Sequence, residues 1–511
     1  MILFGYDWLE QRESLTPQRK ALIDLETKQT VTYQELNKRV DSIADFLWAN
    51  GVRKGDRIAI ISPNDISYFD LIFASAKIGS IFVPFNIRLS KKDIKYLLDD
   101  SKPAILFVHP DFLPLIDEID TPEIVILDEN YNNDSITLNS KWQSYKAALG
   151  FPAREYEKAG LSMDDPWIII YTGGTTGFPK GAVLSYRSVI WNSINTILSW
   201  GIKDSDITVT YLPLFHTGGI NALSMPVLHM GGTVVIGNHY EPAEAVKVIE
   251  EYKCTIILLV PTMYHMLIKT EEFKKAAFPS MEIFLSGGAP CPISIYDAFN
   301  VKGLKFKEGY GLTEAGPNNF YIDPKDALVK KGSVGKPMFY NQVKITDEKG
   351  NELPQGKVGE IWLAGPHLFK KYWNREKETK EAFHGEWFKT GDLGRQDEDG
   401  FYYIVGRKKE MIISGGENIY PLEIENALQQ HLLVDEAVVV GLPDEKWGEV
   451  VSAFVVIKKN EQLNDSDLKD FLIKHLAKYK IPKKFYFLEE LPKTAVGKIS
   501  KTALINMYKQ N

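Results

Sequence analysis

The sequence predicts an α/β protein with a large N-terminal lobe of parallel-type βα layers, a small antiparallel β subdomain within that lobe, and a small α+β lobe at the C-terminus. From Trp167 to Lys307, short apolar runs alternate with helical stretches, which is the rhythm of parallel strands joined by crossover helices. From Gly332 to Val405, short β-like runs are broken by Gly, Pro and Asn, which is typical of a small antiparallel sheet or barrel. After Gly406 strands and helices mix, so we predict domains at 1–406 and 407–511.

Each expected element is a short apolar run or an amphipathic stretch. In the first region the expected strands are 167–171, 233–237, 255–260 and 282–286, and the expected helices are 241–252 and 261–269. In the second region the clearest strands are 359–365 and 400–406. In the C-terminal region the strands are 410–415, 436–442 and 452–457, and the helices are 421–430 and 465–476.

Length and composition describe a folded protein of several domains. The chain has 511 residues, 44% of them hydrophobic and 25% charged, which are ordinary values for globular proteins and exclude wholesale disorder. The net charge of −7 argues against nucleic acid as the main partner, because such proteins carry a broad basic excess. Residues 471–511 are an exception, since nine lysines and two glutamates give them a charge of +7.

Cysteine usage and the N-terminal segment indicate a reducing compartment. Cys254 and Cys291 are too few for a disulfide framework and lack the spacing of a zinc site, so we expect buried thiols. The N-terminus has neither a basic region nor a sustained apolar run, and no window reaches the ~18 apolar residues of a membrane span. We therefore expect a cytoplasmic protein without an integral membrane segment.

The strongest local signal is a loop rich in glycine and threonine between the strand at 167–171 and a helix that Ser185 should cap. It reads Tyr171-Thr172-Gly173-Gly174-Thr175-Thr176-Gly177-Phe178-Pro179-Lys180-Gly181. Glycines let backbone N–H groups approach an anion, and the hydroxyls and the lysine add donors and a charge. The loop suits a triphosphate, although its spacing is that of neither a Walker A loop nor a GxGxxG dinucleotide turn.

This loop and seven later motifs resemble the adenylate-forming superfamily, which contains acyl-CoA synthetases, luciferase and the adenylation domains of peptide synthetases. In order, the later motifs are LPLFH (212–216), SGGAP (286–290), GYGLTE (309–314), WFKTGD (387–392), GRKK (406–409), GGEN (415–418) and PKTAVGK (492–498). Within this superfamily, the overall pattern of the sequence most resembles that of bacterial medium- and long-chain fatty acid CoA ligases. One departure is Lys371, where the family often has glycine before Tyr372-Trp373.

The resemblance implies an ATP site in which positive charge and hydrogen-bond donors surround a crowded polyanion. The loop would close over the β- and γ-phosphates, and the segments around Ala289 and Tyr310 would flank adenine. Thr313 and Glu314 would reach phosphate and magnesium, with Glu314 as the metal ligand, and Asp392 and Arg407 would contact the ribose. The full expected ATP/AMP set is Thr172, Gly173, Gly174, Thr175, Thr176, Gly177, Lys180, Gly288, Ala289, Pro290, Gly309, Tyr310, Gly311, Asp392 and Arg407.

The resemblance also implies that the C-terminal lobe moves between the two steps of the reaction. Lys498 would bridge the substrate carboxylate and the α-phosphate during adenylation, and the lobe would then rotate for thioester formation. Lys409 occupies the family hinge position, and Gly415 and Gly416 fall where the rotated lobe lines a CoA tunnel. The +7 charge of residues 471–511 would help to draw this lobe toward ATP.

His216 lies where acyl-CoA synthetases place an aromatic side chain between the acyl and nucleotide sites, and we count it with Lys498, Thr313 and Glu314 as catalytic. Amino-acid adenylation domains commonly carry Asp there, so an amino-acid substrate is disfavoured. The expected walls of the acyl pocket are small and mainly apolar, which favours a hydrocarbon tail. They comprise Trp191, Gly218, Gly219, Asn221, Ala315 and Gly316.

The predicted activity is therefore an AMP-forming acyl-CoA ligase that uses ATP, Mg²⁺ and CoA and acts on a small-molecule carboxylic acid, with a medium- or long-chain fatty acid as the favoured substrate. A CoA ligase that acts on aryl acids or on succinylbenzoate remains an alternative. So does an acyl-AMP ligase that loads a separate carrier protein, although the 13 residues after Lys498 leave no room for a carrier domain in this chain. An inactive nucleotide-binding scaffold is the alternative of another class, and a homodimer is left open.

Overall fold

An eight-stranded sheet carries the first part of the chain. We describe a computed structural model, which covers residues 7–128, 142–152, 156, 160–173, 179–444, 446–459, 461–493 and 499–508. The strand order is β19-β9-β8-β4-β3-β5-β6-β7, and from β8 to β7 all neighbours are parallel. The bounds are β3 Arg57–Ile61, β4 Ile81–Pro84, β5 Ile105–Val108, β6 Glu123–Ile126, β7 Trp142–Ser144, β8 Pro166–Thr172, β9 Lys180–Ser185 and β19 Lys371–Tyr372.

Two smaller sheets follow. One has the order β10-β11-β1-β2 and the other is the parallel set β12-β13-β14. Their bounds are β1 Lys20–Asp24, β2 Thr30–Thr32, β10 Ile207–Thr210, β11 Thr233–Ile236, β12 Ile256–Leu259, β13 Ile283–Ser286 and β14 Phe306–Glu308. The backbone bond from Thr255 N to Ile207 O, 2.8 Å, joins β10 to the start of β12, so the two sheets lie side by side.

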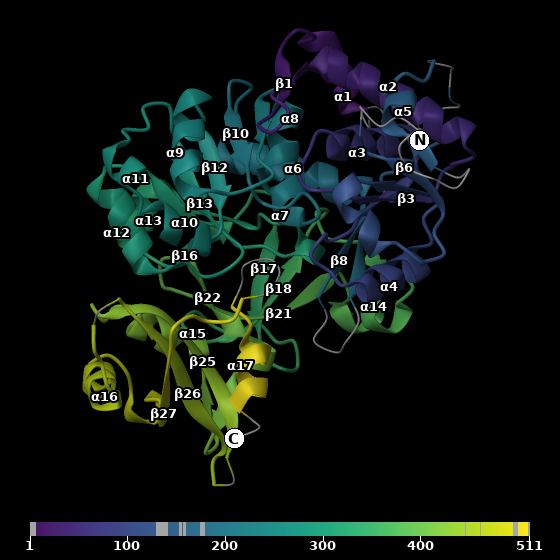
Figure 1. The fold of residues 1–511 in the computed structure, drawn as a ribbon. Coiled ribbons are helices and arrows are strands. Elements are labelled where there is room, and N and C mark those ends of the chain that lie inside the picture. The colour runs from purple at the N-terminus through teal and green to yellow at the C-terminus, as the bar shows by residue number, and fades with distance from the viewer. Residues whose placement is uncertain are drawn as a thin grey trace.

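Helices cover these sheets, as Figure 1 shows. The first group is α1 Trp8–Leu15, α2 Tyr33–Ala49, α3 Ser67–Ile78, α4 Lys91–Ser101, η1 Pro110–Leu115, α5 Tyr145–Leu149 and α6 Tyr186–Trp200. The second is α7 Thr217–Gly219, η2 Ile220–Ser224, α8 Met225–Met230, α9 Pro242–Glu251, α10 Pro261–Leu267, α11 Glu271–Lys275, α12 Ile293–Val301, η3 Thr313–Ala315 and α13 Pro324–Val329.

An antiparallel sheet of order β15-β16-β22-β21-β18-β17, with β20 paired to β21, confirms the small β subdomain. Its bounds are β15 Phe320–Tyr321, β16 Ser333–Pro337, β17 Gln342–Thr346, β18 Gly359–Ala364, β20 Phe383–His384, β21 Trp387–Gln396 and β22 Tyr402–Arg407, with α14 Glu376–Ala382 beside them.

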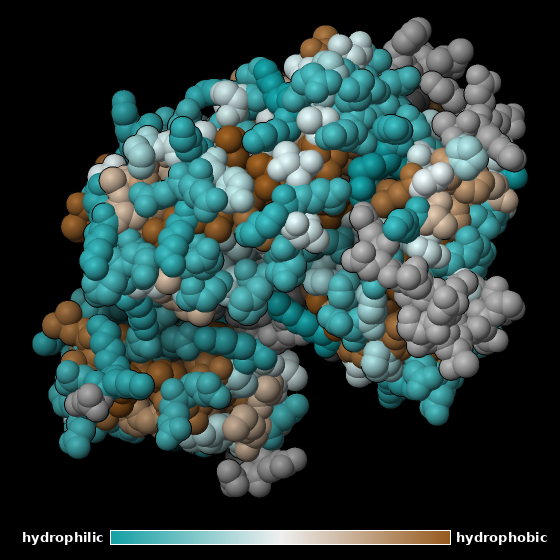
Figure 2. Space-filling view, turned by 45° about the horizontal axis from the view of Figure 1, so that its top comes forward, coloured by the Kyte–Doolittle hydropathy of each residue, from teal (hydrophilic) through white to brown (hydrophobic). Residues whose placement is uncertain are grey.

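The C-terminal residues form a separate body at the lower left of Figure 1, and its core clusters contain only residues beyond 411. Its sheet has the order β24-β23-β26-β25, with β27 parallel to β26. The elements are η4 Lys408–Glu410, β23 Ile412–Ser414, β24 Glu417–Ile419, α15 Pro421–Leu428, β25 Val434–Asp444, β26 Gly448–Ile457, α16 Asp465–Ile473, η5 Lys478–Lys480, β27 Lys484–Leu488 and α17 Lys501–Tyr508. Figure 2 shows the notch that separates it from the rest of the surface.

The fold class and the elements expected from the apolar runs are confirmed, with one correction. The glycine- and threonine-rich loop does not lead directly into a helix, because strand β9 intervenes and pairs antiparallel with β8. The loop is therefore the connection of a hairpin. Ser185 does cap α6, since its hydroxyl accepts from Ser188 N and the reciprocal bond completes a capping box.

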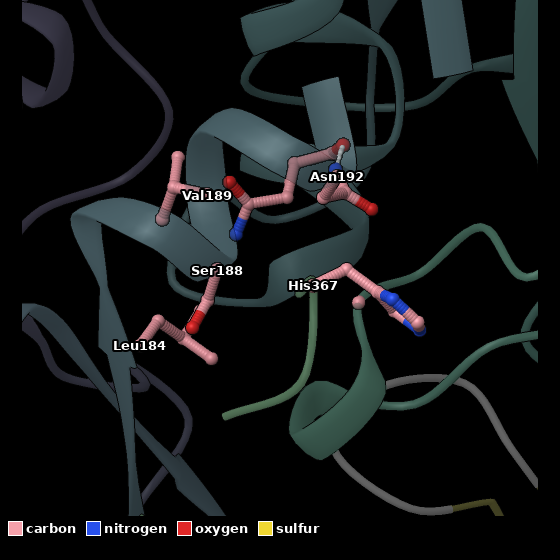
Figure 3. A pocket seen from close by; sticks show the side chains of 7 residues that line it. Leu184, Ser188, Val189, Asn192 and His367 are labelled. Atoms are coloured by element: carbon pink, nitrogen blue, oxygen red, sulfur yellow. Dashed lines mark hydrogen bonds between the residues drawn. The ribbon is translucent and has the colours of Figure 1, made fainter. Parts of the chain in front are cut away.

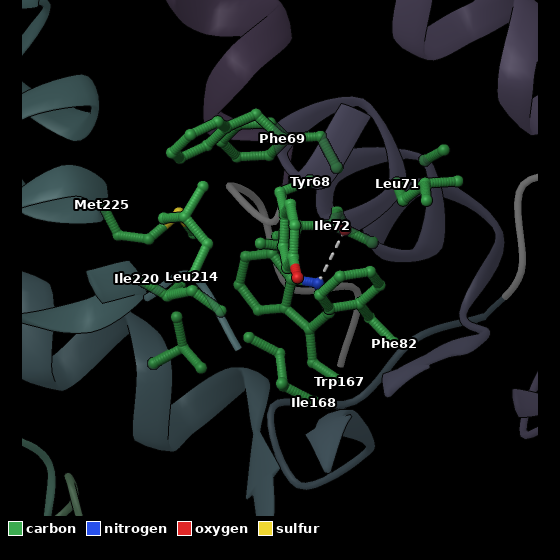
Figure 4. Packing of buried hydrophobic residues seen from close by; sticks show 14 of the residues in the cluster. Tyr68, Phe69, Leu71, Ile72, Phe82, Trp167, Ile168, Leu214, Ile220 and Met225 are labelled. Carbon is green, nitrogen blue, oxygen red and sulfur yellow. Dashed lines mark hydrogen bonds between the residues drawn. The ribbon is translucent and has the colours of Figure 1, made fainter. Parts of the chain in front are cut away.

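The hairpin is anchored by two stacked aromatic side chains in the largest core cluster (Figure 4). Trp167 on β8 is fully buried and donates from Nε1 to Ile72 O at 2.9 Å. Tyr186, the first residue of α6, stacks on Trp167 at 5.0 Å and donates to Ala76 O at 2.8 Å. Both carbonyls belong to α3, so this helix holds the strand before the hairpin loop and the helix after it.

The described residues contain no helix long and apolar enough to cross a bilayer. Both cysteines are buried free thiols, as expected. Burial raises the pKa of Cys254 to about 12 and the pKa of Cys291 well above its usual value, so neither thiol is suited to nucleophilic chemistry.

We predict that Asp70→Ala destabilises the N-terminal lobe strongly. Asp70 is 0% exposed and accepts hydrogen bonds from the Arg39 guanidinium at 2.7–3.1 Å and from the Tyr145 hydroxyl at 2.6 Å. Arg39 is largely but not fully buried, at 16% exposed, and removing the carboxylate that such a cation pairs with costs up to about 5 kcal/mol. Urea unfolding of the full chain measures the change in the free energy of unfolding.

The matched control is Asp204→Ala, which removes a carboxylate 56% exposed and paired to Arg19 at 2.9 Å. It should change the free energy of unfolding far less than Asp70→Ala, because an ion pair exposed to solvent contributes little. Equal effects of the two substitutions would contradict a structural role for the buried pair.

Candidate active site

The motif loops follow the carboxyl ends of parallel strands. Strands β8, β10, β13 and β14 end at Thr172, Thr210, Ser286 and Glu308, and the phosphate loop and the motifs at 212–216, 287–290 and 309–314 come next in each case. The bond from Gly309 N to Ser286 O, 2.8 Å, places the last two loops side by side. In open α/β sheets, ligands bind beyond the carboxyl ends of the strands, and the motifs gather at such positions.

The ends of the phosphate loop lie in register across the hairpin. Thr172 pairs with Lys180, and its hydroxyl donates to Lys180 O at 3.3 Å. The Lys180 ammonium lies 5.5 Å from the centroid of the Tyr372 ring, a cation–π distance. Gly173, the last residue described before position 174, is exposed. Gly174, Thr175, Thr176 and Gly177 lie outside the described residues.

Glu314 is joined to the same tyrosine. Its carboxylate accepts a hydrogen bond from the Tyr372 hydroxyl at 2.8 Å, and its backbone carbonyl accepts from Phe369 N at 2.7 Å. Burial raises the pKa of Glu314, while the Tyr372 hydrogen bond and the charge of Arg407 lower it. Thr313 begins the 3₁₀ turn that presents this carboxylate. Tyr372 therefore links Glu314 to Lys180.

Asp392 forms the second buried acidic centre. It is 4% exposed, accepts from the Tyr310 hydroxyl at 2.6 Å, and pairs with Arg407 Nε at 2.7 Å. Burial raises its pKa, and Arg407 and Tyr310 oppose that rise. The three side chains come from the loop after β14 and from the paired strands β21 and β22, so the centre joins the parallel sheet to the antiparallel one.

The expected adenine-flanking residues lie near Tyr310. Gly288, with φ +80°, and Pro290 are exposed, and Ala289 is half-buried. Gly311 packs against the backbone of Pro317, because a Cβ on Gly311 would lie 2.2 Å from that carbonyl group. The GYGLTE segment is thus folded tightly onto residues 316–317, which sets the direction of the loop that holds Thr313 and Glu314.

The expected acyl-pocket residues fall into different environments. His216 is half-buried, its ring 4.9 Å from that of Phe215, and Trp191 packs edge-on against Tyr340 at 4.9 Å. Asn221 and Gly316 line a common cavity, and Ala315 is fully buried beside it.

The two glycines of the pocket prediction differ in the space around them. A Cβ on Gly218 would meet only Leu212 at 3.6 Å, whereas a Cβ on Gly219 would lie 2.3 Å from Pro213 O. Gly219 therefore allows the start of η2 to lie close against the backbone at 212–213. A side chain at this position would disturb the fold rather than fill a pocket.

The expected hinge and tunnel residues lie at the start of the C-terminal lobe. Lys409 is exposed on η4, and burial of its ammonium and the nearby Arg407 lower its pKa. Gly415 and Gly416, with φ +61° and +87°, form the two-residue turn between β23 and β24, where positive φ is required. Both are exposed.

Lys498 lies outside the described residues. Three residues later, Lys501 pairs with Glu425 at 2.9 Å and with Glu410 of η4 at 3.2 Å, which ties the chain after Lys498 to the hinge region. Lys480 and Lys493 pair with Glu423 and Glu436. The basic excess of residues 471–511 is therefore partly neutralised within its own lobe.

The C-terminal lobe contacts the N-terminal lobe beside the site. Lys269, just after α10, pairs with Asp435 of β25 at 3.0 Å. A small cleft is lined from one side by Pro290 and Cys291 and from the other by Leu422 and Asn426 of α15. Helix α15 therefore lies against the segment that follows the expected adenine wall.

Sequence reasoning did not identify Tyr372 as a site residue. It treated the segment around Lys371 only as a departure from the family pattern, whereas Lys371 lies in β19, paired with Val183 of β9. This pairing carries Tyr372 to Glu314. A tyrosine that directly follows a pair of lysines has no local signal of such a contact.

Among the described residues, no group of three or more histidine, cysteine or acidic side chains could hold a metal ion by itself. Glu314 nevertheless fits magnesium, which usually takes one or two protein carboxylates and completes its shell with water and substrate phosphate. Its half-buried carboxylate has a single fixed donor, Tyr372.

Comparison with known proteins identifies the relatives of this arrangement. The model of the family described as AMP-binding enzyme matches residues 9–373, and that of the AMP-binding enzyme C-terminal domain matches residues 423–498. Curated relatives include a feruloyl-CoA synthase of Amycolatopsis, 34% identical over 97% of both chains. An indoleacetate–CoA ligase of Aromatoleum aromaticum is 35% identical over 97% of this chain and 96% of its own. A long-chain-fatty-acid–CoA ligase of Mycobacterium tuberculosis is 34% identical over 98% and 97%.

Solved structures share the fold over the whole chain. ATP-bound MatB from Rhodopseudomonas palustris superposes with a TM-score of 0.90 at 29% identity, covering 99% of both chains, whereas the apo form of the same protein gives 0.79 over the same coverage. The fold as a whole thus superposes better on the ATP-bound form than on the apo form. The o-succinylbenzoate CoA synthetase of Bacillus subtilis with its acyl-adenylate intermediate gives 0.85 at 33% identity, covering 98% of this chain and 97% of its own.

We predict that Tyr372→Phe shifts the acidic limb of any activity that needs ionised Glu314 toward higher pH. The hydroxyl lowers the pKa of Glu314, so its removal lets burial raise that pKa further. The ring beside Lys180 is retained. The pH dependence of kcat/KM for ATP measures the shift.

Tyr403→Phe is the control, because Tyr403 donates to Asp397 at 3.3 Å, outside the site. It should leave the pH profile unchanged. An unchanged profile in Tyr372→Phe would contradict the assignment of Glu314 as the titrating group.

Proposed function

The chain belongs to the AMP-binding enzyme family and is an acid–thiol ligase, and we propose that it joins a largely apolar carboxylic acid to CoA in two steps. First, a carboxylate oxygen attacks the α-phosphorus of ATP, the bond to pyrophosphate breaks, and acyl-AMP forms. Then the CoA thiol loses its proton, its sulfur attacks the acyl carbonyl, and AMP leaves. One observation carries the proposal: the half-buried Glu314 and the buried Asp392 each accept a hydrogen bond from a tyrosine, and Arg407 pairs with Asp392 beside them.

In the adenylation step, the residues of the chain hold the nucleotide and balance its charge. Asp392 would accept hydrogen bonds from the ribose hydroxyls, and Arg407, already fixed against Asp392, would donate to the same sugar. Lys180 lies at the base of the phosphate loop and would face the β- and γ-phosphates, as would the threonines of the loop. Preorganised donors of this kind stabilise developing charge without reorganisation in the transition state.

Magnesium would be held by Glu314, which Tyr372 orients. The ion neutralises phosphate charge when bound. A related enzyme, the o-succinylbenzoate CoA synthetase of Bacillus subtilis, has been solved in complex with ATP and a magnesium ion. The carboxylate of Glu314 must be ionised for this role, and the Tyr372 hydroxyl favours that form.

The thioester step needs a different arrangement around the same carbonyl, so we propose that the C-terminal lobe rotates about Lys409. Its position between β22 and β23, two residues after Arg407, which is paired with Asp392, supports a pivot. The lobe contact made by Lys269 and Asp435 is a partly exposed ion pair, with side chains 54% and 26% exposed, and pairs near the surface contribute little, about 0–1 kcal/mol. Such a contact can break without a large barrier. Gly415 and Gly416 would then line the CoA tunnel.

The acid itself is proposed at the level of an apolar acyl or aryl group. Phe215 and His216 offer no carboxylate for a substrate ammonium, which disfavours amino acids. The relatives are named for ferulate, indoleacetate, long-chain fatty acids and succinylbenzoate, so aliphatic and aromatic acids have equal support from them. The alternatives to CoA ligation are loading of a separate carrier protein and an inactive nucleotide-binding scaffold.

The experiment is a panel of carboxylic acids with ATP, Mg²⁺ and CoA, read by AMP and pyrophosphate release and by mass spectrometry of the products. A ligase gives AMP, pyrophosphate and an acyl-CoA in equal amounts. Accumulating acyl-AMP with unused CoA would favour the carrier loader. Nucleotide binding without carboxylate-dependent pyrophosphate exchange would favour the scaffold.

We predict that Lys498→Ala disables adenylation and spares thioester formation. Loss of a donor that stabilises transition-state charge costs roughly 10²–10³-fold in rate, measured here as ATP–pyrophosphate exchange. Supplied acyl-AMP and CoA should still give thioester at a rate within about tenfold of the wild type, since that step does not build charge on the α-phosphate.

Lys478→Ala is the matched control, an exposed lysine in the same lobe, and should leave both half-reactions unchanged. Equal losses in both half-reactions of Lys498→Ala would refute the assignment of this lysine to the first step.

A further inference from the structure

Both ends of the phosphate loop are held by one face of helix α4. The Tyr171 hydroxyl, at the start of the loop, donates to Asp100 Oδ2 at 2.7 Å, and the Tyr96 hydroxyl donates to Pro179 O, near the end of the loop, at 3.3 Å. Tyr96 and Asp100 are four residues apart on α4, so their side chains lie on the same face of the helix. One helix therefore contacts the chain before the loop and the chain after it.

The segment that follows β19 completes this contact. Arg375 donates from Nη2 to the Tyr96 hydroxyl at 2.7 Å, and the same guanidinium lies 3.9 Å from Asp100 Oδ1. Trp373 donates from Nε1 to Asp100 O at 3.0 Å and from its backbone N–H to Gly181 O at 2.7 Å. Figure 1 shows α4 and α14, which begins directly after Arg375, together beside β8. Tyr96, Asp100 and Arg375 thus form a clamp at the two ends of the loop.

The hydrogen bonds of this clamp are fixed in direction. Burial and the hydrogen bond to Asp100 raise the pKa of Tyr171, so the phenol keeps its proton and the carboxylate, whose side chain is only 10% exposed, is the acceptor. Arg375 can only donate to the Tyr96 hydroxyl, so Tyr96 uses its own proton for Pro179 O. The clamp therefore cannot turn its groups around without losing these bonds.

The clamp sets the position of the residues expected to face the phosphates. Tyr171 precedes Thr172, Pro179 precedes Lys180, and Thr172 pairs with Lys180 across the hairpin. Tyr96 and Asp100 therefore act one residue away from each member of this pair. Donors and charges that are already in place bind a ligand without the ordering cost that mobile groups incur. The clamp residues can thus act on the nucleotide through the loop ends, without touching it.

We propose that Tyr96, Asp100 and Arg375 are positioning residues that set the affinity for the β- and γ-phosphates of ATP by fixing both ends of the phosphate loop. The inference rests on the proposed function, in which the loop and Lys180 face those phosphates. AMP and acyl-AMP lack these phosphates, so the clamp contributes nothing to their binding. Adenylation therefore depends on the clamp, and thioester formation does not.

The first test compares the affinities of the full chain for ATP and for AMP by isothermal titration calorimetry. Asp100→Ala removes the acceptor for Tyr171 and should weaken ATP binding by roughly 10–100-fold while AMP binding stays within about twofold, since small displacements of positioned groups have effects of that size. Tyr96→Phe removes a single hydroxyl and should weaken ATP binding by roughly 3–10-fold. This milder variant keeps the proposal testable if Asp100→Ala does not fold.

Two further variants separate positioning from stability. Asp100→Asn keeps an oxygen that can accept from the Tyr171 hydroxyl, so it should restore most of the ATP affinity lost in Asp100→Ala. Tyr145→Phe is the matched control, because it removes a buried tyrosine–aspartate hydrogen bond, 2.6 Å to Asp70, elsewhere in the same lobe. It should lower the stability of the fold and leave the ratio of the two affinities unchanged.

The two half-reactions give a second readout. In the clamp variants, KM for ATP in carboxylate-dependent pyrophosphate exchange should rise by the same factors as the dissociation constant. Supplied acyl-AMP and CoA should still give thioester at the wild-type rate. A loss of stability alone would instead lower both half-reactions together.

Equal weakening of ATP and AMP binding in the clamp variants, or unchanged ATP binding in all of them, would overturn the proposal. The same selective loss of ATP affinity in Tyr145→Phe would also overturn it, because the effect would then not belong to the clamp. If the wild-type chain binds ATP but no acid gives AMP and pyrophosphate, the ligase function fails, and the ratio of ATP to AMP affinity still tests the clamp. A wild-type chain that does not bind ATP would overturn both.

Discussion

The rest of the site depends on the contacts that satisfy the buried carboxylate of Asp392, a hydrogen bond from Tyr310 and an ion pair with Arg407. A carboxylate withdrawn from water must be matched by donors or a cation, because an unpaired buried charge is strongly destabilising. Here Tyr310 supplies one donor from the end of β14, and Arg407 supplies the cation from the last residue of β22. The requirement to satisfy one charge therefore fixes the antiparallel sheet against the parallel one and places the boundary with the C-terminal lobe beside the nucleotide.

Glu314 also accepts a hydrogen bond from a tyrosine, but fewer groups satisfy its charge. It has a tyrosine donor but no fixed cation within ion-pair distance among the described residues, and burial raises its pKa. A carboxylate in that condition is best satisfied when a cation arrives with the substrate. Under the proposed function the two acidic centres would divide the work: Asp392 is already matched by Tyr310 and Arg407, and Glu314 would be matched by magnesium arriving with the nucleotide.

The small cavity between α6, η2 and the loop after β18 follows a different rule (Figure 3). Its walls have no charge, and its polarity comes from amide and imidazole groups whose donors are used in a network that runs through Asn319, Asn341 and Asn195. Asn192 Nδ2 and His367 Nε2 are used in internal hydrogen bonds, so Asn192 Oδ1 and His367 Nδ1 are left as acceptors facing the cavity.

The sequence by itself determined the fold class, most strands and helices, the Ser185 cap and the nucleotide motifs, because apolar periodicity and short glycine-rich signatures are local properties of the chain. The pairing of β9 with β8, the contact of Tyr372 with Glu314, and the difference between Gly218 and Gly219 were decided only by the tertiary structure. So were the unpaired acceptors of Asn192 and His367, which lie 175 residues apart in the chain. Whether a glycine has space beside it, or a polar atom has a partner, depends on neighbours that only the packed chain supplies.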